Sequence, residues 1–338
     1  MARPVAHVAP YNRPAMGAPL EFGLIDEAAR FLESRVRKTP LEPSPGLSER
    51  IGVPTWLKLE NLQLTGSFKL RGALFALSRL GPAAREHGVG TCSAGNHGLG
   101  LAYAARELGV AATIFVPSSV DAAKRAGILE LGAEVVDTPF PGYDDSEAWA
   151  RERLAESDAL WVSAFDDPAI MAGNGGSLAM ELLDELTGLQ AVVVPTGGGG
   201  LAAGLAVALE ERVPHASLIC CQHARSPGLA RSLEEGRAVT RLPAIETVAG
   251  GVEGGIGARC FEVLRDRVDQ IALIEEGEIR DAVRWLVDRH GYLVEPSAAV
   301  AAAACLRGDL RVESGPVVVV LTGRNVARET LAAILSGD

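Results

Sequence analysis

The most informative stretch of this 338-residue chain is Thr65-Gly66-Ser67-Phe68-Lys69-Leu70-Arg71-Gly72-Ala73. It follows a short apolar run at 54–59 and precedes a helix-forming segment at 73–77, which predicts a strand, a turn and a helix beginning near Lys69. A lysine there lies among unpaired N–H groups at the positive end of a helix dipole. We therefore expect a lowered pKa and a neutral amine able to form a Schiff base. The competing interpretation is a surface lysine beside a turn.

The residues around Lys69 resemble the signature of the fold-type II pyridoxal-phosphate (PLP) enzymes. Within these, they are similar to the threonine and serine dehydratase group, to which serine racemases are related. The matching positions are Lys58, Glu60, Asn61, Gln63, Thr65, Gly66, Ser67, Phe68, Lys69, Arg71, Gly72 and Ala73. The resemblance extends from about Leu24 to the C-terminus. It implies a two-domain α/β fold like that of tryptophan synthase β, with parallel sheets flanked by helices. It also implies that Lys69 carries PLP and is the catalytic residue, with Phe68 beside the cofactor.

The chain length and the order of the elements predict two domains. Strands and helices alternate in 71–159, as in a small open parallel sheet. Segments 1–70 and 160–338 are expected to form a larger PLP-binding α/β domain, with 1–20 as a loose arm and no secretory signal. The sequence ends soon after the last predicted helix. We therefore expect no regulatory domain of the kind found in feedback-controlled threonine dehydratases.

Composition limits the partners of the chain. A net charge of -11 with no basic run argues against nucleic-acid binding. No apolar run has the length of a membrane span. The five cysteines form no C-x-x-C pair and are expected to be buried free thiols in the cytoplasm, with a catalytic cysteine as the minor alternative. The resemblance implies a small amino-acid substrate and a homodimer.

Four consecutive glycines, Gly197, Gly198, Gly199 and Gly200, stand between a buried strand at 191–195 and a helix that begins near Leu201. Such a loop allows close approach of an anion to backbone N–H groups and suits a phosphate. A dinucleotide fingerprint would require an acidic residue where Gln222 stands. A tight turn that serves only packing is the other alternative. The resemblance implies that this loop and Leu201 hold the PLP phosphate.

A second loop at a strand end reads Ser93-Ala94-Gly95-Asn96-His97. Taken alone, it is a turn before a helix. The resemblance implies that Asn96 meets the 3'-oxygen of PLP, and that Ser93 and the backbone amides of 93–97 bind the substrate carboxylate. His97 as a general base is a minor alternative. Serine racemases have a second serine where this chain has Ala94, so we expect poor racemisation.

Thr322 ends the last buried strand, at 317–321. Taken alone, it is equally a candidate helix N-cap. The resemblance places its hydroxyl at the pyridine nitrogen of PLP, where dehydratases usually have serine. Arg324 departs from the usual glycine.

Other family segments also differ. Asn174 stands for the usual Gln, position 250 lacks its usual acid, and Glu253 is an added charge of unassigned role. Asp166-Asp167 suggests a metal at first sight, but a solvated loop is favoured. No metal site is expected, because the cation positions of some relatives correspond to Gln222 and Gly228.

These features predict a PLP-dependent ammonia-lyase (dehydratase) that converts a small β-hydroxy L-amino acid of the threonine or serine type into a 2-oxo acid and ammonia. One alternative is a threonine-synthase or β-replacement transferase, which would capture the same intermediate with a nucleophile. The other is a PLP-binding protein without turnover. The sequence does not distinguish the individual β-hydroxy amino acids, because all present the same reacting atoms.

Overall fold

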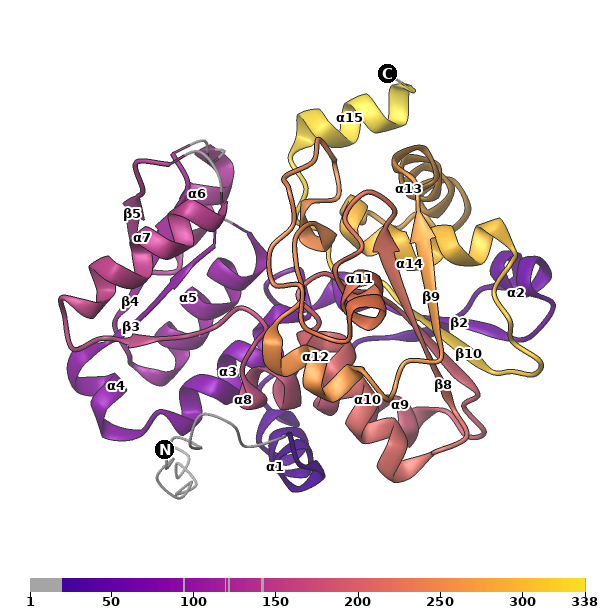
Figure 1. Ribbon diagram of the computed structural model, residues 1–338, viewed down its shortest axis with the longest axis horizontal. Coiled ribbons are helices and arrows are strands. Elements are labelled where there is room, and N and C mark those ends of the chain that lie inside the picture. Colours follow the sequence, from indigo (N-terminus) through magenta and orange to yellow (C-terminus); the bar gives the residue numbers. More distant parts are fainter. Residues whose placement is uncertain (1–19, 94, 119, 121, 141–142, 338) are drawn as a thin grey trace.

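The computed structural model describes residues 20–93, 95–118, 120, 122–140 and 143–337. The predicted arm, apart from residue 20, and Ala94 lie outside the described residues. Two lobes lie side by side (Figure 1), and each is built on one sheet. The strands are β1 Leu41–Pro43, β2 Thr55–Lys58, β3 Val89–Cys92, β4 Ala112–Val116, β5 Glu134–Asp137, β6 Leu160–Trp161, β7 Ala191–Pro195, β8 Ser217–His223, β9 Gln270–Ile274 and β10 Val317–Val320.

The larger sheet has the strand order β1-β2-β10-β7-β8-β9. Only β1 is antiparallel to its neighbour, and the other strands run parallel. The smaller sheet has the order β5-β4-β3-β6 and is entirely parallel. Its last strand, β6, begins just past residue 159. We accordingly propose that the small domain continues through Trp161.

The helices match the predicted alternation. They are α1 Phe22–Leu32, α2 Pro45–Ile51, α3 Lys69–Arg79, α4 Gly81–His87, α5 Asn96–Leu108, α6 Ala122–Glu130, α7 Tyr143–Ala155, α8 Pro168–Met171, α9 Ser177–Glu185, α10 Gly200–Arg212, α11 Gly228–Glu235, α12 Ala258–Leu264, α13 Glu276–His290, α14 Pro296–Arg307 and α15 Arg328–Ser336. The described residues also form three helical segments of other types: the 3-10 helices η1 Glu60–Leu62 and η3 Gly250–Val252, and the π-helix η2 Ala172–Gly176.

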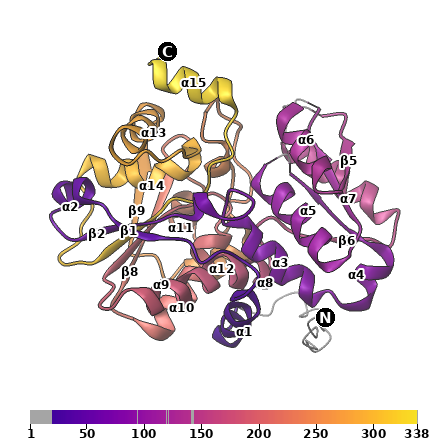
Figure 2. The same ribbon diagram turned by 180° about the vertical axis from the view of Figure 1, so that it is seen from behind.

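The larger sheet is covered on both faces. On β7, Val192 and Val194 pack with α9, α10 and α12, whereas Ala191 and Val193 pack with α13 and α14 on the other side. This alternation follows from the two-residue period of a strand, and it explains why a strand buried on both faces is apolar throughout. Figure 2 shows the molecule from behind, with α13 and α14 on one side of β8 and β9 and α10 on the other.

The five cysteines are free and buried, as the sequence predicted: Cys92, Cys220, Cys221, Cys260 and Cys305. Burial raises the pKa of each thiol. A protonated, inaccessible thiol is a poor nucleophile, which argues against a catalytic cysteine. Among the helices of the described residues, none has both the length and the apolar character needed to cross a bilayer.

Candidate active site

Several residues of the site follow the carboxyl ends of parallel strands. The Asn96 loop follows β3, Ala164 follows β6, the glycine loop follows β7 and Thr322 follows β10. Ligands of open α/β sheets bind outside these ends, because the loops and helix N-termini there face a common crevice. Both sheets therefore contribute to one region, and Lys69 lies at the start of α3, which connects the two lobes (Figure 1).

Lys69 is the first residue of α3, as the sequence predicted. Its partly buried amine donates a 2.8 Å hydrogen bond from Nζ to the carbonyl oxygen of Ala164. The ring of Phe68 lies beside it, with the amine 5.2 Å from the ring centroid. The pKa of Lys69 is lowered to about 8, chiefly by burial. The expected direction is confirmed, although the sequence argument had attributed it to the helix start.

The loop before Lys69 is fixed to the end of β10. The backbone N–H of Phe68 donates to the carbonyl oxygen of Thr322 at 3.1 Å, and Ser67 forms an isolated bridge with Gly323. Thr322 is buried. The helix N-cap interpretation of Thr322 is wrong, because α15 begins later and has Ala327 at its N-cap.

The glycine loop is enclosed on its outer side. Gly199 has φ of 93°, a left-handed conformation that favours glycine, and α10 begins at the next residue. A Cβ on Gly197 would lie 2.5 Å from the oxygen of Gly251, and one on Gly198 would lie 2.5 Å from the Phe165 ring. Side chains therefore have no room in the loop. This glycine cradle before a long helix fits an anion such as the PLP phosphate.

Asn96 joins the two lobes through its side-chain amide. Its Nδ2 donates to Oε1 of Glu295 at 2.6 Å, and its Oδ1 accepts from Nδ2 of Asn325 at 2.7 Å. Nδ2 of Asn325 also donates to the backbone carbonyl oxygen of Thr65 at 2.9 Å. Burial raises the pKa of Glu295 to about 7, against the opposing effects of Asn96, Lys124 and Lys69.

The remaining described residues of the Asn96 loop bear on the general-base alternative. Ser93 Oγ accepts a hydrogen bond from the N–H of Gly95 at 3.3 Å. His97 is buried in the first turn of α5. Burial and the nearby Lys69 lower its pKa to about 3. An imidazole with so low a pKa is a weak base, which disfavours His97 as the proton acceptor.

The paired acids 166–167 cap helices. Asp167 caps α8 by accepting from the N–H groups of Ala169 and Ile170. Asp166 accepts from the first turn of α12, at 2.9 Å from the N–H of Arg259 and 3.0 Å from that of Cys260. The expectation of a merely solvated loop was therefore too simple. Within the described residues, no group of three or more potential ligands could hold a metal ion.

The residues that differ from the family pattern form hydrogen bonds with nearby segments. Arg324 donates from Nη1 to the backbone carbonyl oxygen of Asn61 at 2.8 Å. Glu253, directly after η3, accepts from the N–H of Ile245, in the loop before η3, at 2.9 Å. Asn174, in the π-helix η2, accepts from the N–H of Gly72 in α3 at 2.9 Å. Arg324 and Glu253 thus hold neighbouring loops, and Asn174 holds the first turn of α3.

Sequence reasoning left three of these residues without a role. Ala164 acts through a backbone carbonyl, for which no side-chain signal exists. The contacts of Glu295 and Asn325 with Asn96 were not predicted from the sequence. An acid directly before a Pro-initiated apolar helix is the one signal that singles out Glu295.

The chain is similar to known proteins over most of its length. The sequence profile of the family described as pyridoxal-phosphate dependent enzyme matches residues 32–323. The chain is 41% identical over 317 residues to an L-threonine ammonia-lyase of Geobacter sulfurreducens, covering 94% of this chain and 78% of the relative.

Two solved structures are also similar. Maize serine racemase superimposes with a TM-score of 0.88 at 26% identity, over 95% of this chain and 98% of that one. The processed form of threonine deaminase isoform 2 from Solanum lycopersicum has a TM-score of 0.86 at 28% identity, over 98% of both chains.

The chain therefore belongs to the pyridoxal-phosphate-dependent enzyme family, in its fold-type II threonine and serine dehydratase group. It is a PLP-dependent lyase.

Proposed function

We propose that the chain releases ammonia from a small β-hydroxy L-amino acid, with threonine and serine as the first candidates, and leaves a 2-oxo acid. The observation that carries this proposal is the amine of Lys69, held at the carboxyl ends of the strands with a pKa lowered to about 8. The similarity of the chain to the L-threonine ammonia-lyase of Geobacter sulfurreducens supports the same reaction type.

The residues that we propose to hold PLP fit its chemical groups. The N–H groups of the loop 197–201 suit the phosphate, and Lys69 suits the aldehyde. Asn96 suits the 3'-oxygen, because an amide donates a hydrogen bond without titrating. Thr322 suits the pyridine nitrogen with a hydroxyl, which cannot hold a proton there as a carboxylate would.

PLP, when bound, withdraws electrons from the α-carbon of an amino acid and makes its proton removable. We propose that the neutral amine of Lys69 accepts this proton at Nζ. Its raised neutral fraction near pH 8 suits a general base, because efficient bases have a pKa close to the working pH. We propose that Ser93 and the backbone amides of 93–97 orient the substrate carboxylate.

An ammonia-release screen tests the function. The purified enzyme with PLP is incubated with threonine, serine, a 3-hydroxyaspartate and a phenylserine, each with and without an added thiol. Release of ammonia and 2-oxo acid that is independent of the thiol supports the lyase. Product that forms only with the thiol would indicate a β-replacement transferase. No release of ammonia from any substrate would refute the proposal.

We also propose that the enzyme is a cytoplasmic homodimer, as the family resemblance implies. The chain has a mass of 35.3 kDa. Light scattering on a size-exclusion column should give twice that mass, and a monomer would contradict the proposal.

A further inference from the structure

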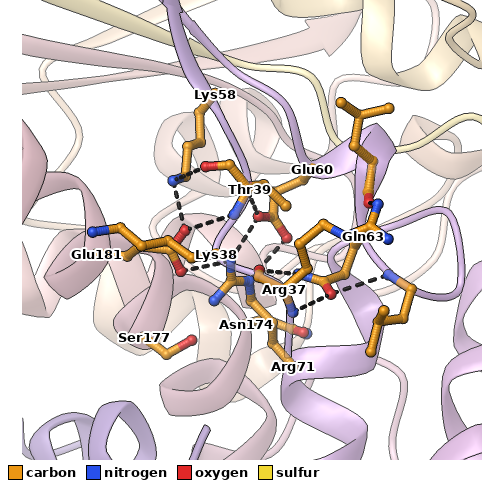
Figure 3. Close-up of polar contacts among 12 residues, drawn as sticks. Arg37, Lys38, Thr39, Lys58, Glu60, Gln63, Arg71, Asn174, Ser177 and Glu181 are labelled. Atoms are coloured by element: carbon orange, nitrogen blue, oxygen red, sulfur yellow. Dashed lines mark hydrogen bonds and ion pairs between the residues drawn. The ribbon is translucent and has the colours of Figure 1, made fainter. Parts of the chain in front are cut away.

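A buried ion pair lies directly beneath the start of α3. Nε of Arg71 donates to Oε2 of Glu60 at 2.9 Å, and Nη2 donates to Oε1 of the same carboxylate at 2.7 Å. Nη2 also donates to Oε2 of Glu181 on α9 at 2.8 Å. Arg71 is 1% exposed and Glu60 is fully buried. Figure 3 shows the guanidinium group between the two carboxylates.

The pair is part of a wider network. Lys58 donates from Nζ to Glu181 at 2.6 Å, and the hydroxyl of Thr39 donates to Glu60 at 2.6 Å (Figure 3). Lys58 also donates to Glu185 at 3.1 Å. Burial by itself raises the pKa of Glu60, but the combined effects of Arg71, Thr39 and Lys58 outweigh it and the pKa is lowered. Glu60 is therefore charged at neutral pH.

Such a network is poor evidence for stability, because desolvation offsets much of the attraction between buried charges. Its directional bonds do specify geometry. A bidentate arginine–carboxylate contact fixes both the distance and the plane of the two groups. The network can therefore hold one part of the molecule in a defined position.

The network holds the first turn of α3. An α-helix turns by about 100° per residue, so the side chains of Lys69 and Arg71 point about 200° apart. Arg71 is thus held on the side of the helix away from the amine. Gly72 is held in the same turn through Asn174. A Cβ on Gly173 would lie 2.7 Å from the Cα of Gly72, so η2 contacts α3 backbone to backbone.

We propose that Arg71 is a positioning residue for the reaction proposed above: its contacts with Glu60 and Glu181 place the first turn of α3, and with it the amine of Lys69. The side-chain contacts of Arg71 are with Glu60 and Glu181, and Arg71 is not among the residues proposed to hold the cofactor. The inference rests on the proposed function for its catalytic meaning, but its structural consequence is measurable without turnover.

The test compares two forms of the cofactor. PLP binds through its phosphate and ring and also bonds covalently to Lys69, whereas pyridoxamine 5'-phosphate lacks the aldehyde and cannot form that bond. For Arg71→Lys, the charge is kept but the planar fork is lost. We expect the Kd of PLP to rise by about tenfold to a hundredfold, the order of loss for a group displaced by about 1 Å. The Kd of pyridoxamine 5'-phosphate should stay at the wild-type value.

A second variant covers a failure of Arg71→Lys to fold. The double change Glu60→Gln with Arg71→Met removes both charges and leaves no unpaired guanidinium, a replacement that proteins often tolerate. It should show the same selective loss of PLP binding. The control is Arg79→Gln at the other end of α3, where Arg79 pairs with Glu27. This variant should keep the wild-type ratio of the two dissociation constants.

The positioning role would be overturned if the folded variants bound both ligands more weakly by the same factor. It would also be overturned if neither Kd changed. A wild-type enzyme that bonds PLP but releases no ammonia from any substrate would overturn the proposed function instead, and the binding comparison would still decide the role of Arg71.

Discussion

The side-chain amide of Asn96 donates a 2.6 Å hydrogen bond to the carboxyl of Glu295, 199 residues further along the chain. Because Asn325 occupies the amide oxygen of Asn96, the amide has one defined orientation, with its nitrogen towards Glu295. The small and large lobes are thereby joined beside the amine of Lys69. A carboxyl and an amine that have displaced pKa values and lie close enough to influence each other are typical of an enzyme site.

Replacing Lys69 should abolish both covalent cofactor binding and turnover. In Lys69→Ala the amine that bonds the PLP aldehyde is gone, so the visible absorbance of the lysine-bound cofactor should disappear with the release of 2-oxo acid. Absorbance spectra and an ammonia assay measure the two effects. Turnover in a Lys69→Ala preparation free of wild-type enzyme would show that another residue does this work.

The rate at which apoenzyme bonds PLP should rise with pH and level off. Only the neutral amine is a nucleophile, and the pKa of Lys69 is lowered to about 8 from an ordinary value of 10.5. The neutral fraction therefore increases about tenfold per pH unit below pH 8 and saturates above it. Stopped-flow absorbance over a pH series gives the midpoint. A rate that still climbs as pH approaches 10.5 would mean that Lys69 has an ordinary pKa.

Glu295→Gln should remove a pH-dependent loss of stability from the apoenzyme. Burial raises the pKa of Glu295 to about 7 from 4.5, so between these values the folded state binds more protons than the unfolded state. Stability due to this group must then fall as pH rises from 4.5 to 7, with the full cost present above 7. The amide of glutamine can still accept from Asn96 and does not titrate.

Melting temperatures of both apoproteins across this range test the point. The melting temperature of Glu295→Gln should increase relative to that of the wild type as pH rises. The exposed substitution Glu313→Gln is the control and should follow the wild-type curve. Parallel curves for wild type and Glu295→Gln would contradict the raised pKa.

Activity should survive treatment with EDTA. Some relatives have acids at the positions of Gln222 and Gly228, and a hard divalent cation prefers charged oxygen ligands. Here Gln222 uses both ends of its amide, donating to the oxygen of Thr196 at 3.2 Å and accepting from the N–H of Ala230 at 3.0 Å. Ammonia release before and after chelation measures the effect. Loss of activity that magnesium or calcium restores specifically would count against this prediction.

The enzyme should eliminate faster than it racemises. Racemisation needs a proton donor on each face of the α-carbon, and Ala94 has no proton to give where serine racemases have a serine. A general acid is typically worth about 10² to 10⁴ in rate. Chiral analysis of unreacted substrate during turnover measures the ratio. D-enantiomer forming as fast as 2-oxo acid would show that another donor exists.

The variant Ala94→Ser provides the matched comparison for racemisation. It should raise the yield of D-enantiomer relative to 2-oxo acid, because it supplies the missing hydroxyl. No change in that ratio would indicate that position 94 does not supply the proton.

The local sequence by itself determined the elements that carry the chemistry. The helix that begins at Lys69, the glycine loop before α10 and the strand that ends before Thr322 depend on neighbours within a few residues, through apolar periodicity and glycine conformations. The small open parallel sheet and the larger doubly wound sheet followed from the alternation of these elements. The lowered pKa of Lys69 was predicted in direction from the same local pattern.

Only the tertiary structure decided which groups meet. Ala164 contacts Lys69 through a carbonyl, Glu295 meets Asn96 from the other lobe, and the caps formed by Asp166 and Asp167 belong to two different helices. The main cause of the Lys69 pKa shift is also tertiary, because burial depends on the packing of segments distant in sequence. Arg71 shows the same limit: the motif contains it and Glu60, but Glu181 joins them only because the fold brings α9 within hydrogen-bond reach of Arg71. Hydrogen bonds and desolvation act over a few ångströms in space and leave no fixed spacing in the sequence.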